Sequence, residues 1–228
     1  MQESVDLWTI INSIIVYGLP ATLFLTAVGL IFGFILGLML ALMRVYGIVE
    51  FQWLASGYEK ILRGIPILVL MFLFGWGMPG LFWFVPAEFR TLAGVILALS
   101  LRSGAYQSQL IRGAILSVSE GQMMAARSIG MTEMQASRHI ILPQALRIAV
   151  PGWSNEYAVL IKDSSFAAAV GIVEMFRIAQ SNLQSYPGLW IPIMVTVAFV
   201  YLIFTLPVTK VVGERQTKKL RELGLGGG

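Results

Sequence analysis

Three long stretches without a charged residue constrain the fold of this chain more than any other feature. They lie between Asp6 and Arg44, between Arg63 and Glu88, and between Arg177 and Lys210. Each exceeds the ~20 apolar residues that a helix needs to cross a bilayer, and a helix satisfies its backbone hydrogen bonds within the segment. A transmembrane barrel would show alternating segments of ~10 residues instead. The sequence therefore predicts an all-α membrane protein.

Two further apolar segments carry charges. We expect five transmembrane helices in all, at about residues 13–43, 61–79, 91–112, 147–170 and 189–209. The third contains Arg102, and the fourth contains Glu156, Lys162 and Asp163. Charges at such depth are costly and usually face a protein interior or a water-filled cavity. For Lys162 and Asp163, three interpretations are open: part of an external gate, a contact with an external partner protein, and a locally paired couple that stabilises the helix.

Lysine and arginine predict the orientation. Outside the spans they gather in the segments 44–63, 112–147 and 210–228, whereas the segments 1–12, 80–90 and 171–188 hold only Arg90 and Arg177. The positive-inside rule then places the N-terminus outside, and the loop 113–146 and the C-terminus in the cytoplasm. We interpret the basic tail 210–228 as a topology and lipid-surface signal, with no nucleic-acid partner.

Glycines mark two places where backbones approach closely or turn. Gly29, Gly33 and Gly37 recur every four residues, on one helix face. They suit either packing inside the subunit or an interface between subunits. The second span opens with Arg63-Gly64-Ile65-Pro66. This is either a simple helix start or a broken one whose free N–H groups receive a carboxylate.

The loop 113–146 is too long for a simple connector. Ser119 and Gln122 fit a capping box that starts a short helix through Arg127, and Gly130 stands where a glycine cap belongs. A second capping box at 132–135 starts a helix that we expect to end near Leu142-Pro143. Small and methionine side chains at 123–126 suit insertion into a partner's groove, while an interfacial helix resting on lipid is the alternative.

The loop also carries a family signature. Met124-Ala125-Ala126, then Gly130, then Ile141-Leu142-Pro143 resembles the EAA-x3-G-x9-I-x-L-P signature of ABC importer permeases. The blocks YEKILRGIPILVLMFLF (58–74), LSLRSGAY (99–106) and KDSSFAAAVGIVE (162–174) are similar to the polar amino-acid importer subfamily. Such blocks run in family order from about residue 18 to 215.

This resemblance implies a single permease domain over 1–228, with the type I importer architecture, in a bacterial cytoplasmic (inner) membrane. It implies a dimer with an identical or homologous permease, two cytoplasmic ATPases and an extracytoplasmic substrate-binding protein. The loop 113–146 would be the coupling helix that docks on the ATPase. Its expected contacts are Gln122, Met124, Ala125, Ala126, Arg127 and Gly130.

Three positions depart from the family pattern. Met124 replaces the signature glutamate, so docking would depend on shape and small residues more than on that charge. Arg102 stands where the subfamily often has asparagine, and Gln109 where it usually has glutamate. The change at Arg102 bears on substrate identity rather than on family membership.

The interior polar residues form a candidate substrate site. Arg102, Tyr106 and Gln109 fall at i, i+4 and i+7, on one stripe of a helix, and Asn155 and Glu156 lie at comparable depth on the fourth span. In related permeases the positions matching Arg102, Tyr106 and Glu156 line a substrate site.

The chemistry of this site suits a zwitterion. Glu156 would take an ammonium and Arg102 a carboxylate, with Tyr106 and the backbone near Gly64 and Ile65 assisting. The alternative is an Arg102–Glu156 ion pair that only neutralises two buried charges.

Several chemistries are not expected of this chain. It has no cysteine, a single histidine at His139 and no G-x-x-x-x-G-K-[ST] phosphate loop. We therefore expect no metal or cofactor, with ATP bound by a separate ATPase, so the chain is a transport subunit and not an enzyme. The alternatives are a permease for another small solute and a stand-alone secondary transporter, which usually has more spans or internal repeats.

Overall fold

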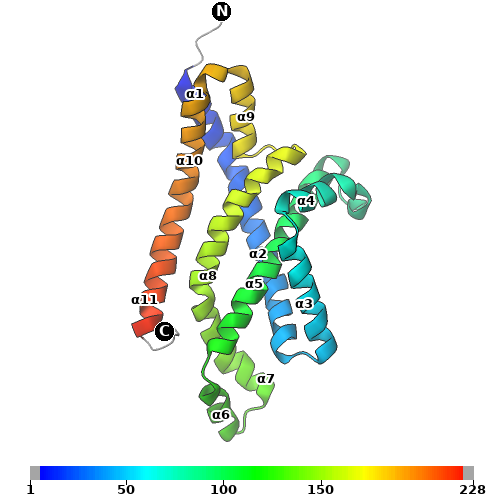
Figure 1. Cartoon of the computed structure of the whole chain (residues 1–228), viewed down its shortest axis with the longest axis vertical. Helices are drawn as coiled ribbons and strands as arrows, with labels where there is room; N and C mark the ends of the chain where they lie inside the picture. Colours follow the sequence, from blue (N-terminus) through cyan, green and yellow to red (C-terminus); the bar gives the residue numbers. More distant parts are fainter. Residues whose placement is uncertain (1–5, 223–228) are drawn as a thin grey trace, which may run out of the picture.

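The computed structural model describes residues 6–222, and every regular element in that range is helical (Figure 1). The α-helices are α1 (Leu7–Ser13), α2 (Leu19–Tyr46), α3 (Val49–Gly64), α4 (Ile67–Phe72), α5 (Arg90–Ser117), α6 (Glu120–Ser128), α7 (Glu133–Ala136), α8 (Leu142–Asp163), α9 (Met175–Ser185), α10 (Trp190–Pro207) and α11 (Arg215–Glu222). Short π-helical and 3-10 segments join several of them.

Two continuous helices are long and apolar enough to cross a membrane. A π-helical turn joins α1 to α2 in one helix, Leu7–Tyr46, and α10 lies within a second, Pro187–Leu220. Both are longer than the predicted spans 13–43 and 189–209. Within the described residues, α5 covers the predicted third span, 91–112, and α8 together with the 3-10 segment Ser164–Val170 covers the fourth, 147–170. Neither is apolar enough to be grouped with the first two, since both carry interior charges.

The predicted second span, 61–79, is not one continuous helix. Residues 61–64 complete α3, and the helical segment Ile67–Gly77 leaves it at an angle of 100°. The break falls at Ile65 and Pro66, whose backbones are extended. Proline disfavours helical backbone in the residue before it and has no N–H to continue the ladder. The two arms together form one bent candidate span.

The predicted end of a helix near Leu142-Pro143 is also wrong. From Glu133 the chain stays helical through α7, a π-helical turn (Ser137–Ile141) and α8. Pro143 occupies the first turn of α8, directly after the wider π turn, where its missing N–H does not break the helix. The helix ends only beyond a 3-10 segment, Ser164–Val170, at Gly171 with φ of 90°.

The glycine stripe of α2 packs inside the subunit, as the first of the two interpretations predicts. A Cβ at Gly33 would lie 2.8 Å from the Cβ of Ser103, and one at Gly37 would lie 2.9 Å from the Cβ of Gln107. Gly104 on α5 receives Leu36 of α2 in return. The absence of side chains at these positions brings the backbones of α2 and α5 together, and these two helices share the most extensive contact in the fold.

Different helices lie at the two ends of the molecule. α1 and α9 lie at one end, and α6, α7 and α11 lie at the other (Figure 1).

Glu174 joins α9 to α2 by hydrogen bonds. Its carboxylate accepts from the N–H of Phe176 (2.9 Å), the N–H of Arg177 (2.7 Å) and the Oγ1 of Thr22 (3.2 Å). Burial raises the pKa of Glu174 to about 6, although these hydrogen bonds act to lower it.

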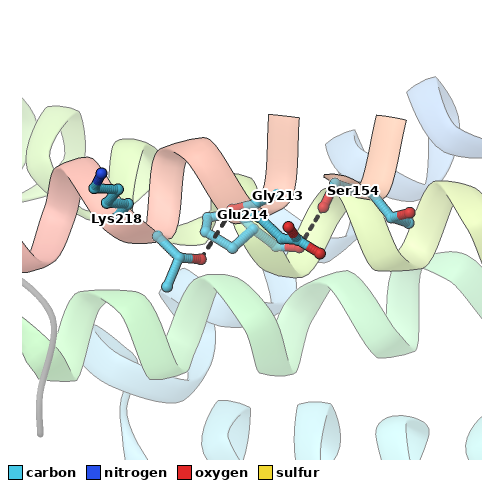
Figure 2. Close-up of a pocket in the computed structure, with 7 residues that line it drawn as sticks. Ser154, Gly213, Glu214 and Lys218 are labelled. Carbon is cyan, nitrogen blue, oxygen red and sulfur yellow. Dashed lines mark hydrogen bonds between the residues drawn. The ribbon is translucent and has the colours of Figure 1, made fainter. Parts of the chain in front are cut away.

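The start of the predicted tail 210–228 is a continuation of α10. A π-helical segment (Val208–Glu214) and α11 pack along α8, where Gly213 lies against Ser154 (Figure 2). A cavity of about 420 Å³ lies there, and Glu214 and Lys218 are among the residues that line it. Residues 223–228 of the predicted tail lie outside the described residues.

Candidate functional site

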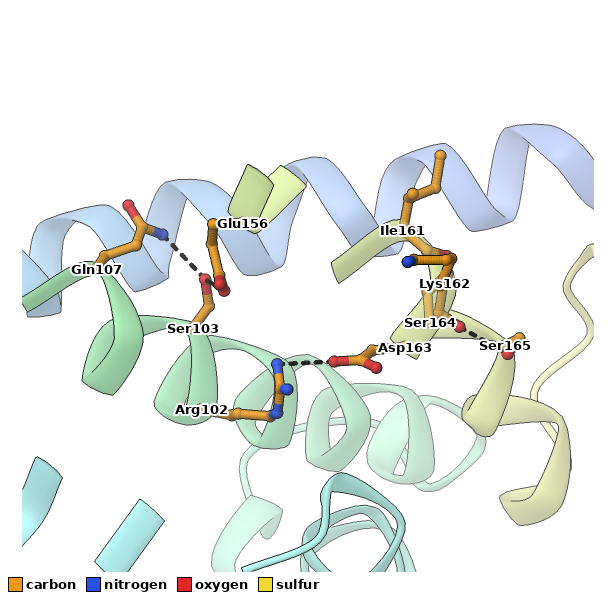
Figure 3. Close-up of polar contacts among 9 residues, drawn as sticks. All are labelled: Arg102, Ser103, Gln107, Glu156, Ile161, Lys162, Asp163, Ser164 and Ser165. Atoms are coloured by element: carbon orange, nitrogen blue, oxygen red, sulfur yellow. Dashed lines mark hydrogen bonds and ion pairs between the residues drawn. The ribbon is translucent and has the colours of Figure 1, made fainter. Parts of the chain in front are cut away.

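A buried polar cluster lies where α5 meets α8 (Figure 3). The Nη1 of Arg102 lies 2.7 Å from the Oδ2 of Asp163, and both side chains are about 15% exposed. Glu156 is 4% exposed, and its Oε1 accepts a hydrogen bond from the Oγ of Ser103 at 2.8 Å. The expected alternative of an Arg102–Glu156 ion pair is therefore wrong. Glu156 and Asp163 lie two turns apart on one face of α8, so Arg102 reaches the second carboxylate while Ser103 binds the first.

A hydrogen-bonded chain extends this cluster to α2. The Nε2 of Gln107 donates to the Oγ of Ser103 (3.0 Å) and to the carbonyl of Leu30 (3.1 Å). All the polar side chains that it joins are buried, so α2, α5 and α8 are held together around Glu156. Neither Ser103 nor Gln107 was predicted as a site residue, although both lie in or beside the LSLRSGAY block.

Two guanidinium groups lie near the ring of Tyr106. The Cζ of Arg102 is 4.7 Å from its ring centroid, and the Cζ of Arg63 is 5.0 Å from it. Cations at such distances are attracted by the ring face. Arg63 lies in the last turn of α3, just before the break at Ile65 and Pro66, so the structure brings this predicted segment to the same cluster. The N–H of Ile65 is not free, because it donates to the Ile61 carbonyl.

Two predicted site residues lie elsewhere. Asn155 is exposed on α8, on a different side from Glu156. Gln109 contacts Glu59 of α3 and not the Arg102 cluster, so the expected stripe divides. The Glu59 carboxylate is buried and also accepts from Ser108, with Arg44 beside it at 3.8 Å. Glu59 was missed because the segment 44–60 was expected to be a connection rather than a helix.

The loop 113–146 has the predicted helix, glycine turn and helix. Gly130 has φ of 86°, and the N–H groups of Gly130 and Met131 donate to the carbonyls of Arg127 and Ala126, which is a Schellman motif. The capping box of Thr132 with Gln135 is confirmed. Ser119 caps α6 through the N–H of Gly121, the other donor that an N-cap oxygen reaches; the expected box with Gln122 is not formed.

Side chains of α6 divide between an inner and an outer face. Ala126 is buried against the rest of the chain, and Gln122, Ala125, Arg127 and Gly130 are exposed. Three large apolar side chains are exposed around them: Met124 (64%), Ile129 (75%) and Met134 (74%). The loop therefore presents an apolar surface at the end of the molecule, while Ala126 anchors it.

Metal chemistry has no candidate site in the part of the chain that the structure describes. Among residues 6–222, no three metal-ligating side chains of histidine, aspartate or glutamate gather in one place.

Known proteins resemble the chain along most of its length. Residues 29–213 match the family described as "Binding-protein-dependent transport system inner membrane component". The "Probable amino-acid permease protein YxeN" of Bacillus subtilis is 38% identical over 84% of this chain and 85% of its own length. The L-cystine transport system permease protein TcyB of the same organism is 37% identical over 92% of this chain and 87% of its own.

The fold matches a solved transporter as well. A chain in a crystal structure of an amino acid ABC transporter with histidines superposes with a TM-score of 0.79 and 31% identity, over 94% of this chain and 99% of that one. The family match and the structural match both extend over most of the chain. It therefore belongs to the family of inner-membrane components of binding-protein-dependent transport systems.

Proposed function

We propose that this chain is the permease subunit of an ATP-driven amino-acid importer and forms its translocation pathway. The observation that carries the proposal is a polar cluster between two helices of a membrane protein, in which Glu156 is buried and Arg102, Tyr106 and Asp163 are partly buried. Charges at such depth commonly mark a substrate pathway. The relatives are named as permeases of amino acids and of L-cystine.

The cluster has the two charges that a zwitterion requires. Glu156 would receive the ammonium, since its Oε2 makes no hydrogen bond among the described residues. Arg102 would receive the carboxylate as a planar two-pronged donor, with Tyr106 beside it. Arg63 contacts the Tyr106 ring, and Gly64 and Ile65, which follow it in the chain, would therefore lie at the border of this site. Asn155 faces away from it and would contribute only from a surface that another subunit covers.

The loop 113–146 would couple this site to ATP hydrolysis. We assign ATPase docking to the outer face of α6, with Gln122, Met124, Ala125, Arg127 and the turn at Gly130. Ala126 would act indirectly, by holding α6 on the chain. ATP would be bound by the ATPase subunit and not by this chain.

The arrangement in the membrane follows from the same assignment. We propose five crossings, with the bent pair of α3 and α4 as the second, α9 outside the cell and α6, α7 and α11 in the cytoplasm. Two such subunits, identical or homologous, would pair with two ATPases and an extracytoplasmic substrate-binding protein in a bacterial inner membrane.

Purification of the complex with its ATPase tests the function. A substrate-binding protein loaded in turn with members of an amino-acid panel should stimulate ATP hydrolysis several-fold for at least one of them. The unloaded binding protein is the control. Stimulation by a different class of solute alone, or ATPase-independent uptake, would replace the proposal by one of its alternatives.

A further inference from the structure

No contact with the substrate has been assigned to Asp163, yet its ion pair is the shortest polar contact in the cluster. Its Oδ2 lies 2.7 Å from the Nη1 of Arg102. Lys162, the adjacent cation, is exposed and takes no part in the ion pairs of the described residues. The sequence-based interpretation of a local Lys162–Asp163 couple is therefore wrong. Asp163 instead bridges α8 to α5 (Figure 3).

Arg102 is held in place by more than this ion pair. Its guanidinium also lies over the ring of Tyr106, 4.7 Å from the centroid. About 15% of the Arg102 and Asp163 side chains remains exposed, whereas the paired atoms Nη1 and Oδ2 themselves are buried, so an entering carboxylate would first meet the exposed part of Arg102. Because the ring holds the guanidinium from one side, one carboxylate could leave Arg102 and another could bind without a large movement of the arginine.

We propose that Asp163 occupies Arg102 in place of a substrate carboxylate, so that an amino acid binds by exchanging its own carboxylate for that of Asp163. This inference rests on the proposed function. It defines the substrate class as solutes with a free carboxylate. It also makes Asp163 a residue that sets affinity by competing with the substrate.

The exchange avoids leaving the Arg102 guanidinium without an anion. A guanidinium taken out of water is strongly disfavoured without an anion, and Arg102 has one carboxylate both before and after the exchange. A neutral carboxamide offers no replacement anion and leaves Arg102 on Asp163. Substrates are thereby selected by charge as well as by shape.

The position of Asp163 gives the exchange a structural consequence. It is the last residue of α8, and the 3-10 segment Ser164–Val170 that follows packs on α4. Ala167 and Val170 of that segment share a core cluster with Ile67 and Leu70. Release of Asp163 would therefore remove the ion pair that joins α5 to the end of α8. The 3-10 segment Ser164–Val170, which packs on the α4 arm of the bent span, begins at that end.

The test begins with the unmodified complex of the permease and its ATPase. Binding proteins loaded with L-cystine, L-glutamine or L-glutamate identify the amino acid that stimulates ATP hydrolysis. If no amino acid stimulates it, the proposed function fails, and this inference fails with it. If one does, its binding to the complex without binding protein is measured by equilibrium binding of the radiolabelled compound.

Asp163→Asn is the decisive variant. Removal of the competing carboxylate should lower the Kd for that amino acid about tenfold, which corresponds to about 1.4 kcal/mol. Lys162→Gln, a change of charge at the next position, should leave the Kd within about twofold. An unchanged or higher Kd in Asp163→Asn overturns the proposal. So does the absence of measurable binding, at millimolar amino acid, to both the unmodified complex and the Asp163→Asn complex.

Two further measurements keep the test decisive. If Asp163→Asn does not assemble, Asp163→Ser, whose smaller side chain admits water to Arg102, should show the same tighter binding. The carboxamide of the same amino acid should bind the unmodified complex at least about tenfold more weakly and gain no affinity from the substitution. An equal gain for the acid and the amide would show that no carboxylate exchange takes place.

Discussion

Among single residues, the glycines of α2 show how a small side chain determines a contact. A Cβ at Gly37 would meet the backbone N of Ser108 at 2.9 Å and the Gly104 carbonyl oxygen at 3.0 Å. Backbone atoms cannot move aside as the end of a flexible side chain can. The close approach of α2 to α5 therefore depends on the absence of a methyl group at this position.

Gly37→Ala should destabilise the subunit by about 1–3 kcal/mol, the usual cost of overpacking a filled core. Gly113→Ala is the matched control, because a methyl group at Gly113 in α5 would have no neighbouring atom within 4 Å, and alanine there should stabilise the helix by about 0.5–1 kcal/mol. Thermal unfolding of the two purified variants checks this. Equal melting temperatures would contradict the packing account.

The sequence predicted which residues would be buried and polar better than it predicted their partners. Arg102, Glu156 and Asp163 stand out because a charge in an apolar span is rare. Their pairing depends on the relative rotation and height of α5 and α8, which no local pattern encodes. Glu59 escaped notice for a different reason: it lies in a segment where charges are ordinary, and only the packing of α3 on α5 buries it.

At the scale of elements, the loop 113–146 could be predicted closely because its signals are local. Caps and a glycine with positive φ act within a few residues, so Gly130 and the capping box at Thr132 were both recognisable. The sharp bend between α3 and α4 was not predicted, although a broken start at 63–66 was one of two interpretations, and the helix end expected near Pro143 was wrong. A proline permits either a break or a continuation, and tertiary packing decides between them.

Ala125→Glu should weaken ATPase docking about tenfold or more, since it places a charge on the exposed apolar face of α6 where a partner's groove would have to desolvate it. Met124→Glu is the matched control: it adds the same charge one residue earlier, where the family signature carries glutamate. The amount of ATPase that copurifies with each variant is the measurement. Equal loss in both variants, or in neither, would contradict the assigned docking face.

For the whole molecule, the proposed orientation predicts on which side of the membrane each end lies, and single cysteines are able to test it. The chain has no cysteine, and α9 and α11 lie at opposite ends of the structure (Figure 1). Single cysteines at Ser181 and Lys218, both exposed, should be labelled by a membrane-impermeant maleimide from outside the cell and from the cytoplasm, respectively. Labelling of both from one side would overturn the proposed orientation.

The most direct test of the account is ATP-dependent amino-acid uptake into proteoliposomes that contain the permease, its ATPase and the loaded binding protein. Glu156→Gln should lower uptake about tenfold or more, because a hydrogen bond to a charged group contributes about 1.5–3 kcal/mol, and should leave assembly with the ATPase intact. Glu214→Gln, at an exposed carboxylate, should transport normally. Unchanged uptake by an assembled Glu156→Gln complex would contradict the claim that the cluster between α5 and α8 binds the substrate.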